Sequence, residues 1–125
     1  IEMLRALGRD PWVIKGARID AIYGLVDLMD RALDASYTFD KKALILYGAR
    51  DDIVKDGPTR MMFSRLPDPP NQPRRFAVYE GGYHMLLRDL AAQKVWTDIT
   101  HWIDNSTTPL PSAADKDAKK YLAGD

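Results

Sequence analysis

Two aspartates and a histidine stand just beyond two apolar runs, where they could act on a substrate together. Asp51 and Asp52 follow the run 43–47, and His84 follows the run 75–79. A carboxylate that hydrogen-bonds an imidazole fixes the tautomer of the ring and stabilises its protonated form. An acid and a histidine in this arrangement make up two thirds of a catalytic triad, in which a nucleophile is the third member.

The two apolar runs are the elements that must bring these residues together. The run Ala-Leu-Ile-Leu-Tyr at 43–47 is typical of a strand buried on both faces, and Arg-Phe-Ala-Val-Tyr at 75–79 predicts a second strand. A helix is predicted between them over residues 57–66. Strands joined in this way are parallel, and ligands bind beyond their carboxyl ends. We therefore predict an α/β fold with the acid and the histidine at one edge of the sheet.

Simpler roles are open to the same polar residues. Asp51 and Asp52 could be solvated turn residues or cap the next helix, and His84 could bond a backbone carbonyl. The turn before the histidine contains Gly81 and Gly82, which can adopt backbone conformations that other residues resist. A metal site is a further alternative, but one adjacent pair and one distant histidine do not guarantee the close cluster that three ligands need. We expect no metal.

Three further helices and a tail complete the expected chain. A short helix is predicted within residues 3–7, a second over 19–33, and a third over 92–104. The third gathers its apolar residues on one side, namely Val95, Trp96, Ile99, Trp102 and Ile103. Its tryptophans are expected in the core, whereas His101 projects away from this side and is expected at the surface. Residues 105–125 are expected to form a loosely ordered tail.

The composition excludes several classes of function. A chain of 125 residues suffices for one domain, and its 18 basic and 18 acidic side chains leave no excess charge, so we expect no nucleic-acid partner. The absence of cysteine excludes disulfides, thiolate catalysis and cysteine-ligated metals, and leaves the compartment open. No apolar stretch is long enough to be a transmembrane segment.

Two blocks of the sequence resemble a known family. Leu-Ile-Leu-Tyr-Gly-Ala-Arg-Asp-Asp-Ile-Val at 44–54 and Tyr-Glu-Gly-Gly-Tyr-His-Met-Leu-Leu-Arg-Asp at 79–89 look like the acid and histidine blocks of α/β-hydrolases. They are closest to the branch of monoacylglycerol lipases and lysophospholipases. In that family the acid stands three residues after the glycine that ends the strand, which selects Asp51 over Asp52. The resemblance implies that Asp51 orients the ring and that His84 is the general base and acid.

The same resemblance implies a substrate site and a division of the chain. It places Ile53, Val54 and Met85 beside the acyl pocket for a lipid-like or small ester. Residues 1–18 would end the cap over the active site, and residues 19–104 would form the C-terminal part of the hydrolase core. No cofactor is implied. Amidases, thioesterases and dehalogenases share similar blocks, so the bond that is cleaved stays open.

One part of the family pattern has no counterpart here. The nucleophile of α/β-hydrolases is a serine on a Gly-x-Ser-x-Gly turn upstream of the acid, and the four serines of this chain lack those glycines: Ser36, Ser64, Ser106 and Ser112. The chain therefore resembles the C-terminal portion of a serine hydrolase, inactive without an N-terminal half that supplies the serine and the oxyanion hole. The alternative is a non-catalytic α/β module for assembly or binding. Because two strands leave open sheet edges, we also expect a homo-oligomer.

Overall fold

The computed structural model describes residues 2–67 and 74–123. Its contacts divide the chain into two compact units, Ile1–Asp34 and Ala35–Asp125. The assignment of residues 1–18 to a cap stays a prediction.

The first unit is helical. It contains α1 (Glu2–Arg9) and most of α2 (Ile19–Ala35), which confirms the two helices predicted here. No residue of α2 is buried. Its predicted apolar stripe is present but uncovered, because Ile22, Val26 and Met29 are each about half exposed.

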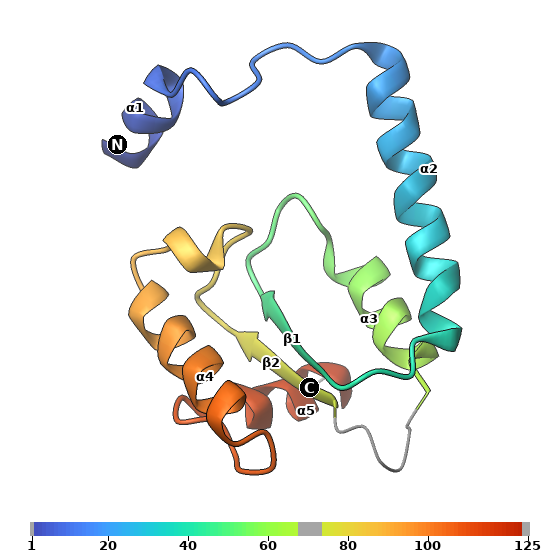
Figure 1. Ribbon diagram of the computed structural model, residues 1–125, viewed down its shortest axis with the longest axis vertical. Helices are drawn as coiled ribbons and strands as arrows, with labels where there is room; N and C mark the ends of the chain where they lie inside the picture. Colours follow the sequence, from blue (N-terminus) through green and yellow to red (C-terminus); the bar gives the residue numbers. More distant parts are fainter. Residues whose placement is uncertain (1, 68–73, 124–125) are drawn as a thin grey trace. The chain divides into compact units, whose positions relative to one another are not determined.

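The second unit is built on two parallel strands. β1 (Ala43–Gly48) and β2 (Arg74–Tyr79) pair in register along their whole length, and α3 (Asp56–Arg65) connects them (Figure 1). This confirms the predicted parallel pair with a helical connection. Both strands end at the same edge of the sheet, so the segments that carry Asp51 and His84 leave the sheet side by side.

Helices pack on both faces of this small sheet. One face packs against α4 (Ala92–Asp104) and against η2 (Leu86–Arg88), the short 3-10 helix that precedes it. The buried cluster on this face consists of Ala77, Tyr79, Leu86, Val95, Leu110 and Ala114. On the other face Phe63 of α3 lies against Phe76, with 4.4 Å between the ring centroids. A second 3-10 helix, η1 (Ser36–Thr38), contacts α3.

The C-terminal segment differs from our expectation of a loose tail. Residues Ala114–Ala123 form α5, which packs against β2. Ala114 and Ala118 lie one helical turn apart and are 0% and 2% exposed, so small side chains let the helix approach the strand closely. Arg75 of β2 holds the start of α5 through an ion pair of 2.7 Å with Asp115. The expectation was wrong because a polar composition hid a helix with a narrow buried stripe.

The third predicted helix has the predicted bounds, but its apolar residues divide between two sides. Val95 is 2% exposed, and Ile99 and Trp102 pack against the core beside it. Trp96 and Ile103 are 48% and 68% exposed, so their expected burial was wrong. The reason is helical geometry: residues 95, 99 and 102 share one face, while residues 96 and 103 share the next.

His101 is less exposed than we expected for a surface residue. Its ring is part-buried, and Nε2 lies 2.7 Å from the hydroxyl oxygen of Thr108. The histidine therefore ties α4 to the segment that leads into α5.

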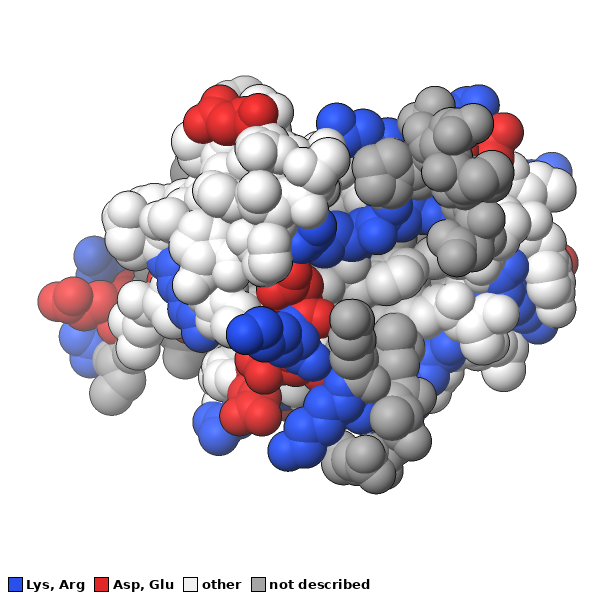
Figure 2. Space-filling model, turned by 90° about the horizontal axis from the view of Figure 1, so that it is seen from below, with Lys and Arg blue, Asp and Glu red and all other residues white. Residues whose placement is uncertain are grey.

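Charged residues of both signs share one face of the molecule (Figure 2). Figure 2 shows basic and acidic side chains beside one another on one face, with uncharged residues between them. Within residues 2–67 and 74–123, no helix has the length and apolar character needed to cross a membrane.

Candidate active site

The segment after β1 holds Asp51 in a fixed position. Oδ1 of its carboxylate accepts hydrogen bonds from the backbone N–H groups of Ile53, at 2.8 Å, and Val54, at 2.9 Å. The carboxylate thus closes a turn with its own backbone, as aspartates at such positions commonly do. Its side chain is only 7% exposed. The second oxygen, Oδ2, is left for another partner.

That partner is His84. Nδ1 of its ring lies 2.9 Å from Oδ2 of Asp51, as the sequence led us to expect for an acid and a histidine at one sheet edge. An ionised carboxylate can only accept hydrogen bonds, so Nδ1 must carry the proton. No hydrogen bond among the described residues reaches Nε2, and the side chain is 43% exposed. The neutral ring therefore presents an unprotonated Nε2, the form required of a general base.

The environment of Asp51 keeps its carboxyl ionised. Burial alone would raise the pKa of this group, but hydrogen bonds from His84 and from the backbone of Val54 and Ile53 outweigh it, so the pKa of Asp51 lies below the ordinary value of 3.8. The charge that holds the imidazole is thus present throughout the neutral range.

The neighbouring aspartate points elsewhere. Asp52 forms an ion pair of 3.1 Å with Lys55, and its side chain is 82% exposed. Of the two candidates, Asp51 is the one that bonds the histidine. The metal alternative also required Asp52, and no group of three or more potential metal ligands occurs among the described residues.

Of the three residues expected to contact the substrate, only Val54 lines the hollow beside Asp51 and His84. A hollow of about 280 Å³ is lined by Asp51 and His84 and by mainly apolar residues, including Val54, Phe63 and Leu86. Ile53 and Met85 do not line it, and they are 70% and 56% exposed. Their assignment to a substrate pocket stays a prediction.

A comparison with known protein families places this geometry in context. The sequence model of a family described as serine aminopeptidase, S33, matches residues 1–91, which include Asp51 and His84. The chain belongs to this α/β-hydrolase family. No match was found among curated proteins or among solved structures.

Family membership makes hydrolysis the class of reaction to consider, and the mixed α/β unit with its parallel strand pair is compatible with a partial α/β-hydrolase fold. Ser64 and Ser112 make structural contacts within this unit. The Ser64 hydroxyl donates to the carbonyl of Met61 within α3, at 2.8 Å, and Ser112 bonds Asp98.

Sequence reasoning missed two residues that support the site of this hydrolase chain. The hydroxyl of Tyr47 donates to the carbonyl of Val54 at 3.0 Å and so braces the turn of Asp51 from the end of β1. Asp98, which is fully buried on α4, accepts a hydrogen bond of 2.8 Å from the hydroxyl of Tyr79 at the end of β2. The only sequence signal for Asp98 was its place on the inner, apolar face of an amphipathic helix.

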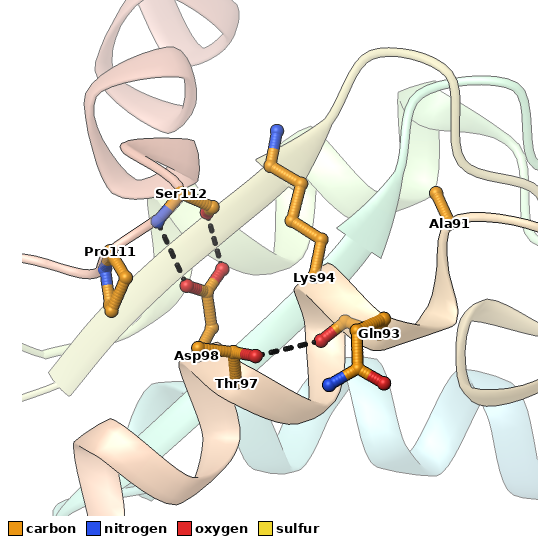
Figure 3. Close-up of a pocket in the computed structure, with 7 residues that line it drawn as sticks. All are labelled: Ala91, Gln93, Lys94, Thr97, Asp98, Pro111 and Ser112. Carbon is orange, nitrogen blue, oxygen red and sulfur yellow. Dashed lines mark hydrogen bonds between the residues drawn. The ribbon is translucent and has the colours of Figure 1, made fainter.

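A larger hollow of about 460 Å³ lies along α4, away from the Asp51–His84 pair. Figure 3 shows hydrogen bonds that join Asp98 to Ser112 and Thr97 to Gln93 in its lining. The carboxylate of Asp98 accepts bonds from the backbone N–H of Ser112, at 3.0 Å, and from its hydroxyl, while the Thr97 hydroxyl donates to the carbonyl of Gln93 at 2.9 Å. The Asp98 carboxylate and the Thr97 hydroxyl therefore have their partners within the protein.

Proposed function

We propose that Asp51 and His84 are the acid and the base of a Ser-Asp-His triad that hydrolyses carboxylic esters of monoacylglycerol or lysophospholipid type. The observation that supports this most directly is the bond of 2.9 Å between Nδ1 of His84 and Oδ2 of Asp51, which leaves Nε2 available. The serine and the oxyanion hole would come from sequence outside these 125 residues.

In the proposed reaction, Nε2 of His84 takes the proton of the serine hydroxyl while the serine oxygen bonds the ester carbonyl carbon. The tetrahedral intermediate then expels the alcohol, which receives the same proton from His84. Water attacks the acyl-serine in the second half and loses a proton to Nε2. The bond to the serine oxygen then breaks, that oxygen takes the proton from Nε2, and the carboxylic acid is released. Asp51 stays ionised throughout and stabilises the imidazolium that forms twice per turnover.

The apolar lining beside the pair is the reason to favour an acyl chain. The hollow next to His84 is lined by Ile45, Val54 and Phe63 among others, and these side chains would bury methylene groups favourably. Ile53 and Met85, which are exposed on either side of the pair, would extend this contact in the proposed complex. The family name refers to aminopeptidases, so amide cleavage by the same residues is the outcome that the assay must separate.

The test uses the complete native gene product and, in parallel, this chain alone. The complete protein is assayed on a monoacylglycerol, a lysophosphatidylcholine and an aminoacyl p-nitroanilide. We expect ester turnover that falls at least about 10³-fold in His84→Ala, because the base is lost. His101→Ala is the matched control, since this histidine lies on α4 and bonds Thr108, and it should retain turnover.

The chain alone should neither turn over p-nitrophenyl esters nor become labelled by a fluorophosphonate, because it lacks the serine turn. Labelling would contradict the placement of the nucleophile. Ester turnover that survives His84→Ala would overturn the proposal, and cleavage of the anilide alone would replace esters by amides. A complete protein without any hydrolytic activity would favour the non-catalytic module.

A further inference from the structure

Gly48 lies where the backbone of the histidine turn meets the end of β1. A Cβ atom at this position would stand 2.5 Å from the carbonyl oxygen of Gly82 and 2.8 Å from that of Tyr83. Real Cβ atoms essentially never approach another heavy atom within 3.0 Å. Both obstructing atoms belong to the backbone, so a side chain at position 48 would have to push the turn away rather than rotate a neighbour aside.

Hydrogen bonds hold the same two backbone segments together. The N–H of Ala49 donates to the carbonyl of Tyr79 at 3.0 Å, and the N–H of Arg50 donates to the carbonyl of Gly82 at 2.9 Å. These donors stand immediately before Asp51, and Gly82 stands two residues before His84. The two segments that carry the acid and the histidine are therefore joined through adjacent peptide groups.

The histidine turn is also confined from its other side. A Cβ atom at Gly82 would lie 2.5 Å from Cδ2 of Leu86, 3.1 Å from Cβ of Tyr79 and 3.2 Å from the backbone of Gly48. Leu86 is 9% exposed and belongs to the buried cluster, so the turn cannot retreat without disturbing the core. Gly81 contrasts with both positions, because a Cβ atom there would meet nothing within 4 Å.

These contacts correct one sequence-based interpretation. We expected Gly81 and Gly82 to be needed for unusual backbone conformations, but neither has a φ between +20° and +160°, the range that side chains rarely adopt. Glycine is needed at positions 48 and 82 because a side chain there would clash with neighbouring atoms.

We propose that Gly48 is a positioning residue, which sets the separation between Asp51 and His84 by letting the histidine turn lie directly against the end of β1. The inference rests on the proposed function for its catalytic meaning. A Cβ atom at position 48 would clear the carbonyl oxygen of Gly82 only if the histidine turn moved away by about half an ångström, the difference between 2.5 and 3.0 Å. Added to a bond of 2.9 Å, this exceeds the normal range of N–H···O hydrogen bonds. A methyl group at position 48 is thus enough to separate the pair.

The test reads the hydrogen bond itself, by ¹⁵N NMR of the histidine side chains in this chain at pH 9. The wild-type chain should show His84 in the Nδ1–H form, since Asp51 holds that proton. Gly48→Ala should lose this form in favour of Nε2–H. Gly81→Ala is the matched control and should keep it. His101, bonded to Thr108, is an internal reporter of folding and should be unchanged in all three proteins.

Gly82→Ala covers the case in which Gly48→Ala does not fold. Its main clash is with the end of the Leu86 side chain, which can rotate, so the fold should persist. The new Cβ atom would still stand 3.1 Å from Cβ of Tyr79 and 3.2 Å from the backbone of Gly48, so it should push the turn away from the strand ends and move the His84 signal in the same direction. The proposal is overturned if a folded Gly48→Ala or Gly82→Ala chain keeps the wild-type His84 signals. It is also overturned if both variants lose the His101 signals, since the contact would then serve folding as a whole. The measurement is independent of turnover, so activity that survives His84→Ala would reject the proposed function without touching this result.

Discussion

The hydroxyl of Tyr79 lies 2.8 Å from Oδ2 of Asp98, and this bond joins the last residue of β2 to the buried face of α4. Burial and the adjacent carboxylate raise the pKa of Tyr79, so the phenol stays a donor at every working pH. The end of β2, which leads into the histidine turn, is therefore held in place by α4.

Removing this donor should destabilise the chain. In Tyr79→Phe the carboxylate of Asp98 keeps only its bonds from Ser112, so we expect the free energy of unfolding to fall by about 1–3 kcal/mol. Urea denaturation measures the change. Tyr83→Phe is the matched control, because Tyr83 is 50% exposed, and it should change stability by less than about 0.5 kcal/mol. Equal changes in the free energy of unfolding in the two variants would show that the bond between Tyr79 and Asp98 does not stabilise the chain.

The lowered pKa of Asp51 predicts an acid-sensitive contribution to stability. A carboxyl that titrates at lower pH in the folded state than in the unfolded state contributes stability above its unfolded pKa and loses it as the pH falls through the folded pKa. Asp51→Asn should therefore be less stable than wild type at pH 7, and the difference should shrink as the pH falls below about 3.8. Thermal melts at pH 7, 4 and 3 measure it. A gap for Asp51→Asn that is constant with pH would refute the assigned cause.

The sheet predicts self-association of the isolated chain. α5 packs against β2, whereas among the described residues β1 pairs with no strand besides β2. An uncovered strand edge tends to pair with another chain, so we expect a homodimer or a larger assembly. Static light scattering at micromolar concentration tests this. A cooperatively folded monomer of 14.2 kDa would contradict the prediction.

The strands and the acid–histidine pair were predictable because their signals are local. An apolar run that ends at a glycine indicates a buried strand, and the rule for parallel strands brings the residues after β1 and β2 to one edge. The choice of Asp51 over Asp52 came from a family resemblance, and the geometry shows what distinguishes them. Asp51 closes a turn onto Ile53 and Val54, and its second oxygen faces His84.

Features that depend on tertiary contact were not predictable in the same way. The role of Gly48 depends on where residues 82 and 83 lie, which no local pattern encodes. α5 did carry a local signal, since Ser112 and Asp115 have the spacing of a capping box. The structure does not form that box, because the Ser112 hydroxyl accepts from the N–H of Ala114 at 3.1 Å and Ala113, between Ser112 and the helix, has a φ of 62°. The low apolar content of the segment concealed this signal.

The most direct test of the central claim compares two adjacent aspartates in the complete native gene product. Asp51→Asn removes the charge that holds the tautomer of His84, and we expect kcat to fall by roughly 10⁴-fold. Asp52→Asn changes an exposed residue paired with Lys55 and should leave kcat within about twofold of wild type. A loss confined to Asp51→Asn is the result that the account predicts. A larger loss in Asp52→Asn, or full activity in Asp51→Asn, would show that the bond between Asp51 and His84 is not the catalytic one.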